Sequence, residues 1–145
     1  MRLLASDGSF LELTVMGYQF LNLEGVSYDS NWLVIAGHAA LAGREWRFRE
    51  PCLLTDEVSG LADWFEARSK DASNDSEIGF IEPNLHFRWN QGALKVNLDL
   101  ECLPSWAPKY NAEEFYLRFS PSVDELASAA LSFRADLLKY PIRPE

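Results

Sequence analysis

The sequence lacks most of the features that mark a catalytic or membrane protein. It contains two cysteines and two histidines, no glycine-rich phosphate loop, and no apolar run near the ~20 residues that a membrane helix needs. Basic residues are few, 13 against 22 acids, and phosphate backbones and anionic membranes are both bound through basic residues. Residues 1–10 resemble neither a signal peptide nor an anchor. We therefore expect a cytoplasmic protein that binds no nucleic acid and no membrane.

The scarce cysteines and histidines point to no catalytic or metal site. Cys52 and Cys102 lie far apart in apolar surroundings, which favours buried free thiols in a reducing compartment over a disulfide. His38 and His86 each fall within a strand pattern, without the clustered Cys and His spacing of a zinc site. The sequence therefore predicts no catalytic residue, no metal and no cofactor.

Apolar residues, by contrast, are abundant. They make up 48% of the 145 residues, and aromatics make up 13%, which suffices for one folded domain spanning residues 1–145. Apolar and polar residues alternate with period two in several runs, as in antiparallel strands with one wet face. These runs lie around residues 11–15, 32–41, 46–49, 85–89, 94–102 and 115–119. Ala42-Gly43 and Asn90-Gln91-Gly92 separate paired runs and predict hairpin turns.

Two stretches have helical spacing instead. In the first, about residues 55–68, apolar side chains recur at i, i+3, i+4 and i+7, with Thr55 in the N-cap position. The second, about residues 121–139, begins either after Ser122, whose spacing to Glu125 matches a capping box, or with Ser120 as cap and Pro121 as first helical residue. We predict an α+β fold, in which two helices pack on a curved, mainly antiparallel sheet of about six to eight strands.

The order of these elements suggests two similar halves. Strands followed by a helix occupy about residues 10–68, and the same order recurs over about residues 79–139. The polar linker between them, residues 69–76, is short, so it predicts a loop within one domain rather than a domain boundary.

The negative charge is concentrated in one stretch. Residues 50–82 hold nine acids against two bases, Arg68 and Lys70, and so carry seven of the nine net negative charges. A concentrated charge makes a directional field that attracts a basic partner. A solvated acidic helix and loop would show the same pattern.

Residues 103–110 form a second unusual stretch. Two prolines hold it extended, and it carries Trp106 and Tyr110 outside any alternating pattern. The stretch is either a loop laid back over the sheet with Trp106 buried, or a rigid aromatic contact patch, because Trp and Tyr are favoured anchors of protein interfaces.

Seven segments follow one another in order along the chain: Gly17-Tyr-Gln-Phe20, Asn31-Trp-Leu-Val34, Pro51-Cys-Leu-Leu-Thr55 with the helix at residues 61–65, Phe80-Ile-Glu-Pro-Asn-Leu85, Leu103-Pro-Ser-Trp106, Phe115-Tyr-Leu117 and Tyr140-Pro-Ile-Arg143. Taken together, these segments resemble the WapI-type immunity proteins, small bacterial antitoxins encoded beside polymorphic, contact-delivered toxins. Two positions depart from the family pattern: Leu21 stands in place of a proline, and Asp56 in place of a bulky aromatic residue.

This resemblance implies a non-enzymatic protein that binds and blocks a cognate toxin domain, typically a nuclease. Such a toxin has a basic cleft, so we expect the contact to lie in the acidic stretch, at Asp63, Glu66, Asp71 and Asp75. The sequence specifies neither the toxin nor an oligomeric state. The alternative is a small-ligand carrier or an enzyme that uses a pocket between the sheet and its helices.

Overall fold

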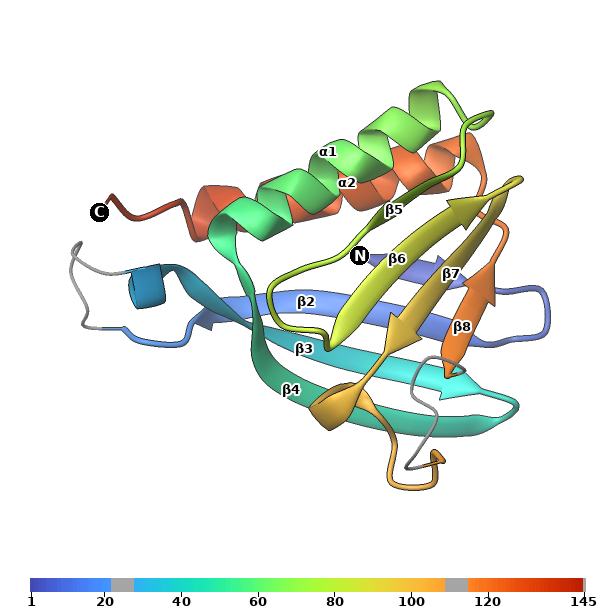
Figure 1. The fold of residues 1–145 in the computed structure, drawn as a ribbon, viewed down its shortest axis with the longest axis horizontal. Coiled ribbons are helices and arrows are strands. Elements are labelled where there is room, and N and C mark those ends of the chain that lie inside the picture. Colours follow the sequence, from blue (N-terminus) through green and yellow to red (C-terminus); the bar gives the residue numbers. More distant parts are fainter. Residues whose placement is uncertain (22–27, 109–114, 145) are drawn as a thin grey trace.

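The computed structural model describes residues 1–21, 28–108 and 115–144. It consists of two four-stranded antiparallel sheets and two long helices (Figure 1). The first sheet, in the order β1-β2-β3-β4, comprises β1 (Arg2–Leu4), β2 (Phe10–Tyr18), β3 (Trp32–Leu41) and β4 (Arg44–Leu54). The second, in the order β5-β6-β7-β8, comprises β5 (Ser76–Ile78), β6 (Leu85–Asn90), β7 (Ala93–Leu98) and β8 (Tyr116–Phe119). The helices are α1 (Thr55–Lys70) and α2 (Val123–Lys139), with short 3-10 helices η1 (Tyr28–Asn31) and η2 (Leu100–Cys102).

The predicted α+β fold with two helices and up to eight strands is confirmed. The strands divide between two sheets, and each sheet is followed in the chain by one helix, so the order of elements repeats. The chain passes directly from the last strand of the first sheet into α1, because β4 ends at Leu54 and α1 begins at Thr55. The next strand, β5, begins the second sheet.

The inner faces of both sheets and the buried faces of both helices share one hydrophobic cluster. The two helices lie side by side along one side of the sheets (Figure 1). Phe65 of α1 lies between Phe87 of β6 and Phe133 of α2, with ring centroids 5.7 and 6.0 Å away, and all three side chains are fully buried. Burial of each such side chain contributes ~1.5–3 kcal/mol to folding, so this layer holds the two halves together.

Both predicted hairpin turns are confirmed. Ala42 and Gly43 join β3 to β4 with φ angles of 52° and 79°, and Gln91 and Gly92 join β6 to β7 with φ angles of 49° and 79°. Two successive residues at positive φ make the turn whose twist matches that of the flanking strands. Glycine occupies the second position in both turns because it adopts this conformation without strain.

The helix starts were predicted with mixed success. Ser122 caps α2: its hydroxyl accepts from Glu125 N at 3.1 Å, while the Glu125 carboxylate accepts from Ser122 N at 3.4 Å. The prediction that Thr55 caps α1 is wrong. Thr55 is the first helical residue, because the Glu57 carboxylate binds Leu54 N at 2.9 Å and the Thr55 hydroxyl donates instead to Asn31 Oδ1 at 3.0 Å.

Candidate functional site

The acidic stretch folds back on itself, so that residues 71–82 return along α1. Ile81 N donates to the Glu57 carboxylate at 2.8 Å near one end of the helix, and Trp64 Nε1 donates to Ser76 Oγ at 3.0 Å farther along. We call α1 together with residues 71–82 the acidic band. Its carboxylates belong to Asp56, Glu57, Asp63, Glu66, Asp71, Asp75, Glu77 and Glu82.

Asp63 and Glu66, the first two predicted contact residues, project from α1 and share one cation. Arg134 of α2 donates to Asp63 Oδ1 at 2.8 Å and to Glu66 Oε2 at 2.6 Å, and Lys70 Nζ lies 3.3 Å from Glu66 Oε1. The pKa of the Glu66 carboxyl is held below its ordinary value, first by the hydrogen bond from Lys70 and then by the charge of Arg134. Asp63 nevertheless leaves 73% of its side chain exposed, so it presents most of its charge to solvent.

Asp71 and Asp75, the other two predicted contact residues, lie beyond the C-terminal end of α1. Asp71 accepts from Ser73 Oγ at 2.5 Å and from Ser73 N at 2.9 Å, and these bonds hold its pKa below the ordinary value. Asp75 accepts from Gln91 N at 3.1 Å, which ties the acidic band to the β6–β7 turn. The four predicted residues thus form two pairs on the acidic band, and both residues of this second pair are exposed.

Two further acids of the acidic band, Asp56 and Glu82, were not among the predicted contact residues. Glu82 follows Ile81, whose N–H binds Glu57, so it lies near the N-terminal end of α1 where Asp56 also lies. Both side chains are exposed, and within the described residues neither has a hydrogen bond or an ion pair. In the described residues, their charge is therefore not neutralised by an ion pair, as that of Asp63 and Glu66 is by Arg134.

Trp106 belongs in part to the core. Its half-buried ring packs edge-on against Trp46 and Phe115, with centroids 5.6 and 5.8 Å apart, and the Arg44 guanidinium lies 5.2 Å from its centroid. The described part of the stretch, residues 103–108, thus lies against the first sheet as in one of the two predicted alternatives, although Trp106 is half-buried rather than buried. Tyr110 lies outside the described residues.

His38 and His86 lie on β3 and β6, and both cysteines are buried. His38 lies on the exposed face of the first sheet, with Glu45 Oε2 3.2 Å from its Nε2. Cys52 and Cys102 are both buried free thiols, and a hydrogen bond with Cys52, followed by burial, raises the pKa of the Cys102 thiol. Among the residues that the structure describes, no group of three or more His, Cys, Asp or Glu side chains gathers as a metal site would require. In the same residues, no helix is long and apolar enough to cross a membrane.

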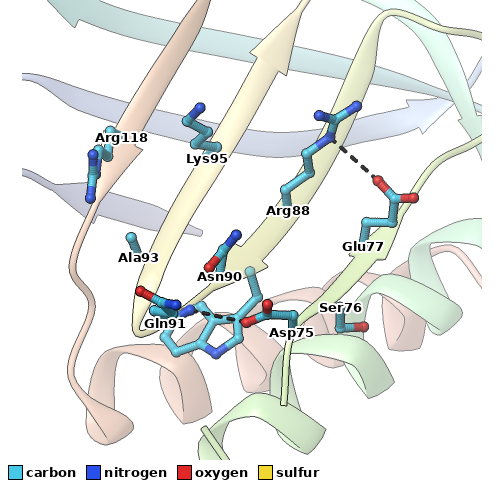
Figure 2. A pocket seen from close by; sticks show the side chains of 10 residues that line it. Asp75, Ser76, Glu77, Arg88, Asn90, Gln91, Ala93, Lys95 and Arg118 are labelled. Carbon is cyan, nitrogen blue, oxygen red and sulfur yellow. Dashed lines mark hydrogen bonds and ion pairs between the residues drawn. The ribbon is translucent and has the colours of Figure 1, made fainter. Parts of the chain in front are cut away.

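The middle of the space between the sheets and the helices is filled by side chains. Phe65, Phe87, Phe119 and Phe133 are fully buried there, where the alternative hypothesis placed a ligand pocket. At the edge of this space, Met1 and residues of β1, β2 and α2 line a hollow of about 440 Å³. A larger hollow, of about 650 Å³, lies on the exposed face of the second sheet, beside the β6–β7 turn (Figure 2).

The chain matches the Immunity protein WapI-like family over residues 2–141, and it belongs to that family. This confirms the resemblance seen in the sequence and supports an immunity role in general terms. No curated protein and no solved structure matches the chain.

Proposed function

We propose that this protein is a cytoplasmic, non-enzymatic antitoxin that binds and neutralises a cognate nuclease-type toxin domain through the acidic band. The observation that carries the proposal is the concentration of eight carboxylates on α1 and the segment that returns along it. Membership of an immunity protein family supports a cognate toxin as the partner.

The chemistry of a nuclease explains why an acidic surface suits this partner. A nuclease must hold phosphate groups, so its active cleft carries Lys, Arg or a metal ion. A surface of exposed carboxylates fits such a cleft in place of the nucleic acid. The uneven charge of the antitoxin also speeds encounter, because opposite fields steer the two proteins together.

Within the acidic band we place the contact at Asp63, Glu66, Asp71 and Asp75. The 73% exposure of the Asp63 side chain supports this choice. Asp71 and Asp75 support it because both are exposed on the segment that follows α1. Arg134 lies between Asp63 and Glu66 and offsets part of their charge. We therefore expect Asp63 to act on the rate of encounter more than on the lifetime of the complex.

Stopped-flow association with the cognate toxin domain tests the proposal. We expect the association rate to fall at least tenfold between about 50 mM and about 500 mM salt, because screening shortens the reach of the field. We expect Asp63→Lys to slow association by about three- to tenfold at low salt. Glu45→Lys makes the same charge change on β4, outside the acidic band, and should have a much smaller effect.

A rate that does not depend on salt, or equal effects of Asp63→Lys and Glu45→Lys, would contradict a contact through the acidic band. Circular dichroism melting of both variants shows that each is folded. The comparison therefore measures binding rather than stability.

A further inference from the structure

The exposed face of the second sheet carries three cations in one row. Strand pairing places Arg88 of β6 opposite Lys95 of β7, and Lys95 opposite Arg118 of β8. Figure 2 shows the three side chains side by side across the strands, with Glu77 of β5 completing the row at its edge. We call Arg88, Lys95 and Arg118 the basic row.

Such a row works against folding. Neighbouring strands lie ~4.8 Å apart, and like charges directly opposite each other repel. Among the described residues, an acid forms an ion pair with the row at its edge alone, where Arg88 Nε lies 3.3 Å from Glu77. Lys95 Nζ lies over the ring of Tyr116, 4.2 Å from its centroid, and in the described part of the chain Arg118 has neither an ion pair nor a hydrogen bond.

The first sheet shows the arrangement that avoids this repulsion. Across its exposed face, pairing sets Arg2 opposite Glu12, Glu12 opposite His38, and His38 opposite Arg47. The two arginines at the ends of this row are therefore separated by Glu12 and His38. Arg2 forms an ion pair with Glu12 at 3.4 Å. The exposed face of the first sheet thus alternates charges, whereas that of the second sheet carries a row of like charges. This row is positive although the net charge of the chain is −9.

The surroundings of the row indicate the class of partner. It lies in the hollow of about 650 Å³, whose lining also includes the polar side chains of Ser76, Asn90 and Gln91. Three cations bind a few carboxylates, but they are too few to hold a nucleic acid against the net negative charge of this chain. The acids Asp75 and Glu77 line the same hollow at one edge, so the positive charge open to an anionic partner is centred on Lys95 and Arg118.

We propose that the basic row is a second contact surface for the toxin domain and binds a carboxylate-bearing patch on it. The inference rests on the proposed function and extends it. The row and the acidic band are continuous, because Glu77 of the band pairs with Arg88 and Asp75 binds the β6–β7 turn. Adjacent surfaces of opposite sign fix the orientation of a partner and reject partners that carry the wrong pattern.

The double variant Lys95→Gln/Arg118→Gln tests the inference by the sign of its effect. If only the overall field mattered, removal of two positive charges would tighten binding to a basic toxin domain. If the row contacts carboxylates, the dissociation constant rises instead, by about tenfold. Arg47→Gln/Arg49→Gln makes the same charge change on the exposed face of β4 and is the matched control.

The outcomes separate the two proposals. Tighter binding in both double variants overturns the basic row as a contact and leaves the acidic band standing. Weaker binding only in Lys95→Gln/Arg118→Gln supports the row, and an unaltered association rate in Asp63→Lys then counts against the acidic band alone.

A probe of known composition tests the row without the toxin. Amide shifts in ¹⁵N-labelled protein are followed as hexaglutamate or inorganic tripolyphosphate is added. We expect hexaglutamate to shift amides of β6, β7 and β8, with affinity about fivefold weaker in Lys95→Gln/Arg118→Gln. A response to tripolyphosphate alone, or no response at these strands, overturns a carboxylate site.

Discussion

Replacement of Trp106 by alanine separates a packing role from a contact role. The ring makes two edge-on aromatic contacts, to Trp46 and Phe115, and lies against the Arg44 guanidinium. Each aromatic pair is worth ~0.5–1.5 kcal/mol, and an exposed cation–π contact ~0.5–1 kcal/mol. Partial burial of the indole adds ~1 kcal/mol. We therefore expect Trp106→Ala to lower the free energy of unfolding by about 3 kcal/mol, the lower end of the range for buried tryptophans.

Urea unfolding of the variant measures this loss. With a slope of ~2 kcal/mol per M, a loss of ~3 kcal/mol moves the midpoint down by ~1.5 M. Trp106→Phe keeps an aromatic ring against Trp46 and should lose about half as much. The dissociation rate of the toxin complex, measured on folded Trp106→Ala, should then equal that of the natural protein.

An unchanged midpoint together with faster dissociation would refute this assignment. It would mean that the half-buried ring contributes its free face to the toxin, as aromatic anchors of interfaces do. The acidic band and the basic row would then be joined by an apolar anchor on the other sheet.

Two further predictions concern the core. Gly37→Ala should destabilise the protein by about 1–3 kcal/mol in urea unfolding, because a Cβ there would lie 2.0 Å from the Phe48 ring; the loss should shrink when Phe48 is replaced by leucine, and simple additivity would contradict the clash. Neither Cys52 nor Cys102 should react with iodoacetamide at pH 8 in the folded state, because the hydrogen bond between them and then burial raise the pKa of the Cys102 thiol. Both should react in urea, and mass spectrometry of the folded protein that found either alkylated would refute the packing.

The strands and helices could be predicted because each element repeats one rule along its length. A strand with one wet face alternates with period two, and the Ser122–Glu125 capping box lies within one helical turn. The division into two sheets depends on which strands pair, and the pattern of each strand is the same whichever neighbour it has. Local rules therefore identified the two helices and six of the strands, but neither the short strands β1 and β5 nor the pairing. The run predicted at residues 94–102 ends as a strand at Leu98, because Leu100 takes a positive φ of 53° and begins a 3-10 helix.

The candidate site shows the same limit. The acidic composition of residues 50–82 is visible in the sequence. The ion pairs that Arg134 forms with Asp63 and Glu66 are not, because Arg134 comes from the other helix. The basic row is hidden for the same reason. Arg88, Lys95 and Arg118 lie in separate alternating runs, and only strand register places them side by side.

The segments that resemble the family hold the fold together. Asn31 Oδ1 accepts from Thr55 Oγ1 and from Arg143 N, at 3.0 and 2.8 Å, and the hydroxyl of Tyr18 donates to the Pro141 carbonyl. The Arg143 guanidinium lies 3.5 Å from the centroid of the Tyr18 ring. Four segments far apart in the sequence thus meet where the C-terminal residues close over β2 and β3.

The contact residues proposed above have a different relation to those segments. Every member of the basic row lies outside them, as do Glu66, Asp71 and Asp75, while Asp63 takes the exposed position of its helical segment. Antitoxins that share a fold but bind different toxins need contact residues that are separate from the residues that stabilise the fold. Substitutions of stabilising residues cost folding free energy, whereas exposed charges can be exchanged at little cost. The family pattern therefore identifies the scaffold, and the arrangement of surface charge is where specificity for one toxin would reside.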